Sequence, residues 1–418
     1  MKKLNEDIVI LDFRRAARRL ESIARKTPLE HHAGLSEKHE CNVYLKREDL
    51  QVVRSYKLRG AYNMMSSLTR AELDRGVICA SAGNHAQGFA YSCKKLNARG
   101  IVFMPLITPA QKINQTRLFG GSFVEIRLTG DNYDECAAAA KRYGDNHGMT
   151  EIPAFNDPLI IEGQGTVGME ILDEHPNPDF VFVPVGGGGL AAGVGSYCKL
   201  YSPKTKIIGV NPEGAPAMYQ AFKKGRPVIL DKFETFVDGA AVKTVGELTY
   251  SICRDVVDEM CIIPDGKICS TILKLYNDDA IVTEPAGAMA LSALDEFSDV
   301  IRGKNIVCII SGGNNDIGRM PEIKERSLQY EGLKHYFLIR FAQRPGALKE
   351  FVSNVLGPND DITRFEYIKK TNKEAAPALV GIELCRKEDY DFLLARLKKS
   401  GFQFTELKSG EEVTQYIV

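Results

Sequence analysis

The residues with the clearest chemical use are a lysine and a run of glycines. Lys57 lies within Ser55-Tyr56-Lys57-Leu58-Arg59-Gly60-Ala61, a short polar loop, and Gly186 to Gly189 are four consecutive glycines directly after an apolar, strand-like segment. Each glycine costs roughly 0.5 to 1 kcal/mol of backbone entropy compared with alanine, so such a run indicates close approach to a ligand, most often an anion. A lysine amine for an aldehyde carbon and a glycine turn for a phosphate are the two anchors that pyridoxal phosphate requires.

Two further loops carry polar groups that such a site needs. Ser81-Ala82-Gly83-Asn84-His85 follows the apolar segment 77–80, and Ser311-Gly312-Gly313-Asn314 follows the segment 305–310. Because the first loop opens a helix, its N–H groups and the Ser81 hydroxyl suit a substrate carboxylate, and the Asn84 amide suits the phenolate oxygen of the cofactor. The structural alternative is a helix cap for Ser81 or Asn84.

The serine after segment 305–310 indicates the type of reaction. A Ser311 hydroxyl opposite the ring nitrogen leaves the pyridine neutral, whereas a carboxylate there would make it a stronger electron sink. The weaker sink favours β-elimination or β-replacement over transamination. Lys57 is also close in sequence to Arg54 and Arg59, and we expect their charges to lower the pKa of its amine.

A nucleotide site is a weaker interpretation of the glycine run. The run lacks the Gly-Lys-Ser/Thr of a phosphate-binding P-loop. The stretch 186–191 matches the tolerant form Gly-x-Gly-x-x-Gly/Ala, yet no acidic residue closes the next apolar segment, 207–211, where a ribose contact is expected. The phosphate of another cofactor fits better.

Apolar runs alternate with helical patterns over most of the chain. We expect strands at 77–80, 101–104, 122–126, 180–185, 207–210 and 305–310, and helices at 11–25, 86–96, 133–143 and from 191. This alternation predicts an α/β fold with parallel sheets, in which functional loops lie at the carboxyl ends of the strands.

The pattern changes after Met320-Pro321, where a charged connector begins. We expect a strand at 335–341, a helix at 346–356, strands at 363–369 and 378–383, a helix at 390–399 and a strand at 402–406, in the order βαββαβ. The predicted organisation is a catalytic domain over 1–325, in which a small subdomain at about 55–150 is inserted in a large one, and a second domain over 326–418.

Composition limits the class of partner. The 418 residues include 54 Lys plus Arg and 54 Asp plus Glu, which argues against nucleic acid or an anionic membrane as a partner. No apolar stretch approaches the roughly 20 residues of a membrane span, and no signal peptide is recognisable. Ten scattered cysteines without a Cys-x-x-Cys pair indicate neither a metal site nor a disulfide framework. We expect a cytoplasmic protein with a small-molecule substrate.

In their order, the four loops resemble those of the fold type II pyridoxal phosphate enzymes, and among these the threonine dehydratase family. The resemblance covers about 5–320 and extends to Met104-Pro105, 238–242 and 284–288. It implies that Lys57 is the Schiff-base lysine, that Asn84 contacts the ring oxygen and that Ser311 faces the ring nitrogen. The other implied ligands are Gly186, Gly187, Gly188, Gly189 and Leu190 for the phosphate, Gly239 and Glu284 near the ring, and Ser81, Ala82, Gly83, Asn84 and His85 for the substrate.

The resemblance also implies an activity. This is dehydration and deamination of L-threonine to 2-oxobutanoate and ammonia, the first step toward isoleucine, with Lys57 removing the α-proton. Related serine racemases have a serine where this chain has Ala82, and that difference argues against racemisation. The alternatives are serine dehydration, β-replacement as in cysteine synthase, and a non-catalytic amino-acid sensor.

The trailing βαββαβ unit resembles the ACT-like regulatory domain of the same family. Arg344-Pro345-Gly346-Ala347-Leu348 matches the turn into its first helix. The resemblance implies inhibition by isoleucine, with valine as a second effector, in a homo-oligomer that is a tetramer in the family. A tail that only dimerises the enzyme is the alternative.

Overall fold

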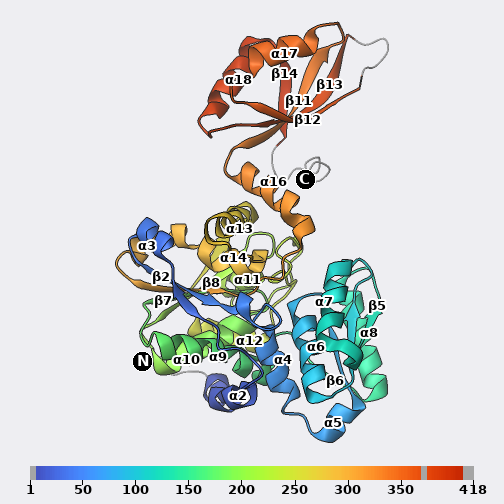
Figure 1. Cartoon of the computed structure of the whole chain (residues 1–418), viewed down its shortest axis with the longest axis vertical. Coiled ribbons are helices and arrows are strands. Elements are labelled where there is room, and N and C mark those ends of the chain that lie inside the picture. Colours follow the sequence, from blue (N-terminus) through green and yellow to red (C-terminus); the bar gives the residue numbers. More distant parts are fainter. Residues whose placement is uncertain (1–5, 369–373, 408–418) are drawn as a thin grey trace. The chain divides into compact units, whose positions relative to one another are not determined.

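The structure is a computed structural model that describes residues 6–368 and 374–407 (Figure 1). Packing divides the described residues into two compact units, one within 1–265 and 275–316 and the other within 266–274 and 317–418. The boundary expected at 325/326 falls within one helix, α16 (Met320–Tyr330), and the division into domains 1–325 and 326–418 stays a prediction. No helix among the described residues has the length and apolar character needed to cross a membrane.

The first unit is built on a six-stranded sheet. All its neighbouring strands pair in parallel except the first two, which are antiparallel. The strands in spatial order are β1 (Leu29–His31), β2 (Asn42–Arg47), β10 (Asn305–Ile310), β7 (Phe180–Pro184), β8 (Lys206–Pro212) and β9 (Glu259–Ile263). Parallel sheets are covered on both faces, which is why β7 and β10 consist of almost uninterrupted apolar residues.

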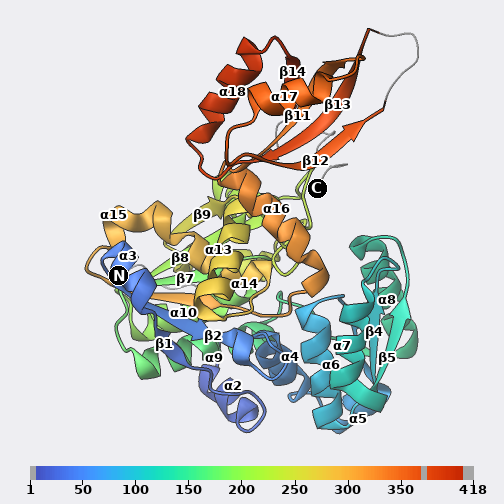
Figure 2. The same cartoon turned by 45° about the horizontal axis from the view of Figure 1, so that its top comes forward.

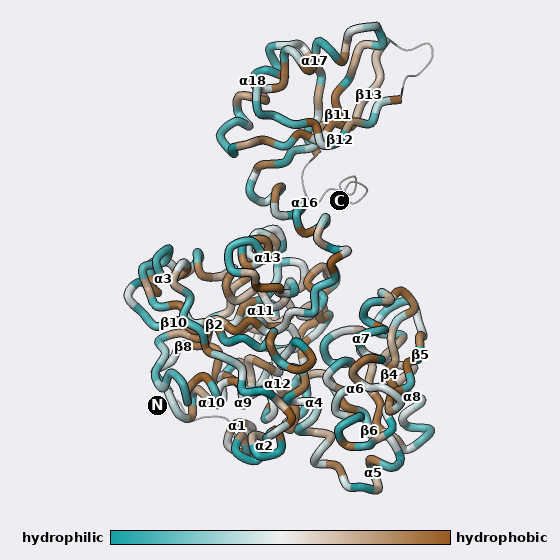
Figure 3. The backbone as a smooth tube through the Cα atoms, viewed as in Figure 1, coloured by the Kyte–Doolittle hydropathy of each residue, from teal (hydrophilic) through white to brown (hydrophobic). Residues whose placement is uncertain are grey.

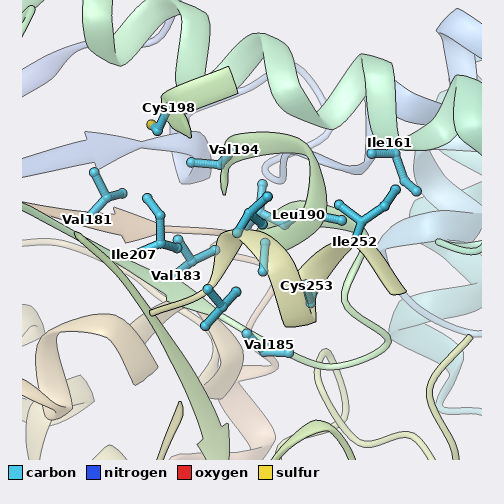
Figure 4. Close-up of a cluster of buried hydrophobic side chains, with 14 of the residues drawn as sticks. Ile161, Val181, Val183, Val185, Leu190, Val194, Cys198, Ile207, Ile252 and Cys253 are labelled. Carbon is cyan, nitrogen blue, oxygen red and sulfur yellow. The ribbon is translucent and has the colours of Figure 1, made fainter. Parts of the chain in front are cut away.

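Helices cover this sheet and complete its core. Figure 4 shows valines of β7 in one buried cluster with side chains of α9 (Pro158–Glu174), α10 (Gly189–Tyr201) and α12 (Glu247–Val256). The other helices of this part of the chain are α1 (Glu6–Val9), α2 (Phe13–Leu20), α3 (Ala33–His39), α4 (Lys57–Met65), α11 (Ala217–Lys224), α14 (Pro285–Ser292) and α15 (Ser298–Ile301). Helix α13 (Asp265–Asp279) belongs mostly to the second unit.

A second parallel sheet lies within the same unit. Its strands are β5 (Val124–Leu128), β4 (Gly100–Met104), β3 (Val77–Ala80) and β6 (Thr150–Glu151), in this spatial order. Hydrophobic residues along β4 appear brown in Figure 3, and all its side chains are buried. The helices of this part are α5 (Arg70–Arg75), α6 (Asn84–Leu96), α7 (Ala110–Gly120) and α8 (Tyr133–His147). The extent of about 55–150 for this subdomain stays a prediction.

The second unit confirms the order βαββαβ. Its elements are β11 (Lys334–Ala342), α17 (Ala347–Val355), β12 (Asp361–Tyr367), β13 (Ala375–Glu383), α18 (Asp389–Lys399) and β14 (Gln403–Leu407). The sheet is antiparallel in the order β12-β13-β11-β14, and α17 and α18 pack against each other beside it (Figure 2). Residue 369, the expected end of β12, lies outside the described residues.

Several predicted elements need correction. The first amphipathic helix ends at Leu20, well before 25, because Ser22 has a φ of +62° and breaks the helical backbone. Lys57 is the first residue of helix α4, so it does not lie in a loop. Strands β2 and β9 were not predicted at all.

Candidate active site

One pocket of the first unit gathers residues from segments that are far apart in the sequence. Its lining consists of Tyr56, Lys57, Asn84, Pro184, Gly186, Gly239, Ala240, Glu284, Ala286 and Ser311. Asn84 follows β3, Gly186 follows β7 and Ser311 follows β10, each at the carboxyl end of a parallel strand. Gly186 and Ser311 thus lie at the carboxyl edge of the six-stranded sheet and Asn84 at that of the four-stranded sheet, the edges at which open α/β sheets bind ligands.

Lys57 has the properties of a reactive amine. Its side chain lines the pocket and is half-buried, and Nζ donates a hydrogen bond to the Ala154 carbonyl oxygen at 3.2 Å. Burial disfavours the charged ammonium and lowers the pKa of Lys57 to about 8, while the negative charge of Glu284 acts in the opposite direction. A substantial fraction of this amine is therefore neutral near neutral pH, as a nucleophile or a base requires.

The expected role of the arginines in lowering this pKa is wrong for Arg59. The Arg59 guanidinium is fully buried and makes bidentate ion pairs, with Glu48 at 2.7 Å and Glu170 at 2.6 Å. Its charge is thus compensated by two carboxylates, and desolvation is the cause of the low pKa of Lys57. Sequence proximity did not reveal that Arg59 points into this ion-pair network.

Glu284 and Asn84 form a second polar pair in the pocket. Asn84 Nδ2 donates to Glu284 Oε1 at 2.5 Å, and Asn84 is 9% exposed. Burial, followed by the charge of Asp238, raises the pKa of Glu284 to about 7, against the hydrogen bond from Asn84 and the positive charges of Lys112 and Lys57. This carboxyl group can therefore change its protonation state near neutral pH.

The glycine turn offers an uncapped helix N-terminus. Helix α10 begins at Gly189, and its N-cap residue Gly188, with a φ of +94°, supplies no side chain to the first N–H groups. A Cβ on Gly187 would lie 2.3 Å from the Phe155 ring, and one on Gly186 would lie 2.8 Å from the Ala240 carbonyl oxygen. The glycines are thus required by close packing behind the turn, and the N–H groups are left for an anion.

Ser311 lies on a loop that is joined to the lysine segment. Tyr56 N donates to the Ser311 carbonyl oxygen at 3.2 Å, and Gly313 N donates to that of Arg54 at 2.9 Å. The Ser311 hydroxyl donates to the Ala286 carbonyl oxygen at 3.2 Å. Ser311 therefore lines the pocket from a loop whose position is fixed by the backbone before Lys57.

Four residues of the second loop do not line the described pocket. Ser81, Ala82 and Gly83 are half-buried, and Ser81 Oγ accepts a hydrogen bond from Gly83 N at 3.2 Å. His85 is buried with Nε2 2.8 Å from the Ile152 carbonyl oxygen, and burial, then the Lys57 charge, lowers the pKa of His85 to about 4. His85 is therefore neutral, and its contact with the backbone indicates a structural role. Substrate binding by the other three residues stays a prediction.

The other residues expected to bind the phosphate also do not line the pocket, although they directly follow Gly186 in the chain. Gly187, Gly188, Gly189 and Leu190 form the turn and the start of α10. Four lining residues were not predicted, namely Tyr56, Pro184, Ala240 and Ala286. Each is adjacent in sequence to a predicted residue or within two positions of one, which is the signal that could have found them.

The residues present fit pyridoxal phosphate. An amine of lowered pKa, an amide donor and a serine hydroxyl meet in one pocket, and Gly186 of the same lining leads into the uncapped N-terminus of α10, which suits a phosphate. These are the groups that hold the aldehyde, the phosphate, the ring oxygen and the ring nitrogen of this cofactor.

Comparison with family models gives two matches. Residues 20–312 match the family model described as pyridoxal-phosphate dependent enzyme. Residues 325–417 match the model described as C-terminal regulatory domain of threonine dehydratase. The two matches together span nearly the whole chain.

Individual relatives agree with these matches. The chain is 55% identical to a biosynthetic L-threonine dehydratase of Halalkalibacterium halodurans, over 99% of each chain. It is 52% identical to that of Bacillus subtilis, over 100% of this chain and 99% of the relative.

Solved structures show the same fold. A processed threonine deaminase isoform 2 of Solanum lycopersicum superposes with a TM-score of 0.71 at 41% identity, covering 77% of this chain and 91% of that one. A maize serine racemase superposes with a TM-score of 0.70 at 29% identity, covering 76% of this chain and 97% of that one. The fold is therefore that of the fold type II enzymes with a C-terminal regulatory domain, and the cofactor is pyridoxal phosphate. The chain belongs to the pyridoxal-phosphate dependent enzymes, within the family of biosynthetic threonine dehydratases.

Proposed function

We propose that this enzyme converts L-threonine to 2-oxobutanoate and ammonia, the first step toward isoleucine. The observation that carries the proposal is the Lys57 amine of lowered pKa in a pocket that Asn84, Glu284 and Gly186 also line. Full-length identity of 52% and 55% with biosynthetic L-threonine dehydratases supports the substrate.

The cofactor supplies an electron sink that makes the α-proton of a bound amino acid acidic. Lys57 would hold the cofactor through Nζ and, with the substrate bound, would accept that proton on the same atom. Its pKa of about 8 leaves roughly a tenth of the amine neutral at pH 7, far more than the ordinary value of 10.5 would leave, as a base requires.

The other pocket residues hold the cofactor in this proposal. The N–H groups at the start of α10, from Gly186 to Leu190, bind its phosphate. Asn84 donates to the ring oxygen, the Ser311 hydroxyl faces the ring nitrogen, and Glu284 and Gly239 lie beside the ring. A serine in that position leaves the ring nitrogen uncharged and favours elimination of the β-hydroxyl.

The test is release of 2-oxobutanoate from L-threonine by the purified protein, with L-serine as the competing substrate. We expect L-serine to be turned over with a kcat/KM about 10 to 200 times lower, because one methyl group in an apolar pocket contributes roughly 1 to 3 kcal/mol. Bound-cofactor absorption without turnover of L-threonine would contradict the proposal and favour serine dehydration or β-replacement. Absence of the absorption would favour an amino-acid sensor.

We further propose that residues 326–418 are an ACT-like regulatory domain that binds isoleucine, with valine as a second effector. The match of 325–417 to the regulatory domain of threonine dehydratase supports this role. Within Arg344-Pro345-Gly346-Ala347-Leu348, Gly346 has a φ of +86° and open space where a side chain would project, so the backbone of this turn is accessible to a ligand. The measurement is the isoleucine dependence of turnover.

The oligomer and the cellular compartment are also proposals. A homotetramer follows from the family resemblance, and light scattering of the purified protein tests it. A cytoplasmic location is supported by ten cysteines that are all free thiols, as expected in a reducing compartment.

A further inference from the structure

Asn314 connects two walls of the pocket, although it is not among the lining residues. Its Nδ2 donates to the Val53 carbonyl oxygen at 2.9 Å and to Asn84 Oδ1 at 2.7 Å. Val53 belongs to the segment that leads into Lys57, and Asn84 is the first residue of α6. One amide group therefore ties the lysine segment to the second loop.

These hydrogen bonds determine which end of each amide faces which neighbour. A backbone carbonyl can only accept, so the group of Asn314 next to Val53 is its NH₂. The same NH₂ meets Asn84, which must present its oxygen to it. The Asn84 NH₂ is thereby turned to the opposite side, where it donates to Glu284 Oε1 at 2.5 Å. The Val53 carbonyl oxygen therefore sets the orientation of both amide groups, and this orientation also suits the Glu284 carboxylate.

The position of Asn314 is itself fixed by the backbone around it. The backbone N–H of the preceding residue, Gly313, donates to the Arg54 carbonyl oxygen at 2.9 Å. Thr283 Oγ1 donates to the Gly312 carbonyl oxygen at 3.0 Å, and Glu284 N donates to the same oxygen at 3.2 Å. The loop therefore has little freedom to move, and Asn314 can hold Asn84 without being held by it.

Asn84 has one more donor than Glu284 uses. Its NH₂ carries two hydrogens, and Glu284 is the partner of this group within residues 6–368 and 374–407. We propose that Asn314 is a positioning residue, which holds the Asn84 amide in the orientation in which its second N–H can donate to the ring oxygen of pyridoxal phosphate. This inference rests on the proposed function. Without Asn314, the Asn84 amide can rotate and present its oxygen, which would repel an anionic ring oxygen.

A double-mutant cycle on the full-length holoenzyme tests the inference. The variants are Asn84→Ala, Asn314→Ala and the double variant, and the readouts are the dissociation constant of pyridoxal phosphate and the pH midpoint of its visible absorption band. We expect Asn314→Ala to weaken cofactor binding about tenfold, because the hydrogen bond at stake involves a charged oxygen. The midpoint should shift in the same direction as in Asn84→Ala.

The decisive comparison is the effect of the second substitution. In the Asn84→Ala background, Asn314→Ala should change the dissociation constant less than twofold, because its target is already absent. Equal effects of Asn314→Ala in both backgrounds would overturn the inference. Asn314→Asp is the second variant, since it retains the size of the side chain and removes the donors, and it should weaken binding at least as much as Asn314→Ala.

The control is Asn177→Ala, at an exposed position, which should bind the cofactor as the wild type does. Wild-type protein that fails to bind pyridoxal phosphate or to release 2-oxobutanoate would overturn the proposed function. A normal wild type together with an unaffected Asn314→Asp variant would overturn only the role of Asn314.

Discussion

Asn84 and Glu284, 200 residues apart in the sequence, share a hydrogen bond of 2.5 Å in the wall of the pocket. The carboxyl group of this pair is buried, and its pKa is raised to about 7 from the ordinary value of 4.5. A carboxyl group whose pKa is higher in the folded state than in the unfolded state stabilises the fold only while it is protonated. Its contribution is complete below pH 4.5 and is lost as the pH rises through about 7.

Glu284→Gln should remove this pH dependence. Relative to the variant, the cofactor-free wild type should lose roughly 3 kcal/mol of unfolding free energy between pH 4.5 and 8, as a shift of about 2.5 pKa units implies. The measurement is the thermal midpoint of both proteins across this pH range. Glu37→Gln, at an exposed position, is the matched control and should leave the wild-type profile unchanged. Parallel profiles for the wild type and Glu284→Gln would show that Glu284 does not titrate in this range.

Lys57 should capture the cofactor with a rate that depends on its own ionisation. Only the neutral amine attacks an aldehyde, and burial lowers the pKa of Lys57 to about 8. The rate of appearance of the visible band, measured by stopped flow after mixing cofactor-free protein with pyridoxal phosphate, should rise with pH and reach half its maximum near pH 8. A midpoint near the ordinary lysine value of 10.5 would contradict the burial argument.

Replacing this lysine should abolish activity without unfolding the protein. Lys57→Ala should show no turnover of L-threonine and should retain the circular dichroism of the wild type, because a small side chain at the first position of α4 leaves the helix intact. Lys204→Ala, at an exposed position, is the control and should be fully active. Full turnover by Lys57→Ala would be incompatible with the proposed catalytic role.

The sequence predicted the part of the site that depends on local chemistry. Asn84, Gly186 and Ser311 each lie in a short segment of unusual composition at the end of an apolar run, Lys57 lies in a short polar segment, and all four line the pocket. Parallel strands bring Gly186 and Ser311 to one edge of the six-stranded sheet, so their meeting follows from topology, whereas Asn84 follows a strand of the second sheet and its approach to them does not. The order βαββαβ was predictable for the same reason, since each of its elements has its own periodicity.

The ion-pair network behind Lys57 was not predictable. Lys46 is completely buried in β2. In the sequence, a charged residue at this position is typical of an exposed strand. Lys46 Nζ lies 2.7 Å from Glu170, and Arg59 binds the same carboxylate and Glu48. These partners are up to 124 residues apart, and no local pattern indicates which charges will meet. The missed strand β2 and the wrong role for Arg59 have this common cause.

Breaking this network should destabilise the first unit strongly. Arg59→Met removes the partner of Glu48, which is fully buried, and an uncompensated buried charge costs on the order of 3 to 5 kcal/mol. The measurement is the urea midpoint of unfolding followed by circular dichroism. The matched control is Arg70→Ala, which breaks the exposed pair with Asp74 and should change the stability by less than about 1 kcal/mol. Equal midpoints for the two variants would show that Glu48 finds another partner.

Removal of the C-terminal domain should separate activity from regulation. A cut at the expected boundary, 325/326, would divide α16 and remove Ser327, whose hydroxyl lies 2.9 Å from that of Ser270 on α13. Ending the chain after Glu331 instead retains this contact and removes the whole βαββαβ unit.

The truncated enzyme should keep turnover of L-threonine within about threefold and lose its response to isoleucine, because the proposed effector turn around Gly346 is absent. The measurement is 2-oxobutanoate release across a range of isoleucine concentrations, compared with the full-length enzyme at the same oligomeric state. Unchanged inhibition after truncation would place the effector site in the catalytic unit. The C-terminal unit would then serve only to join subunits.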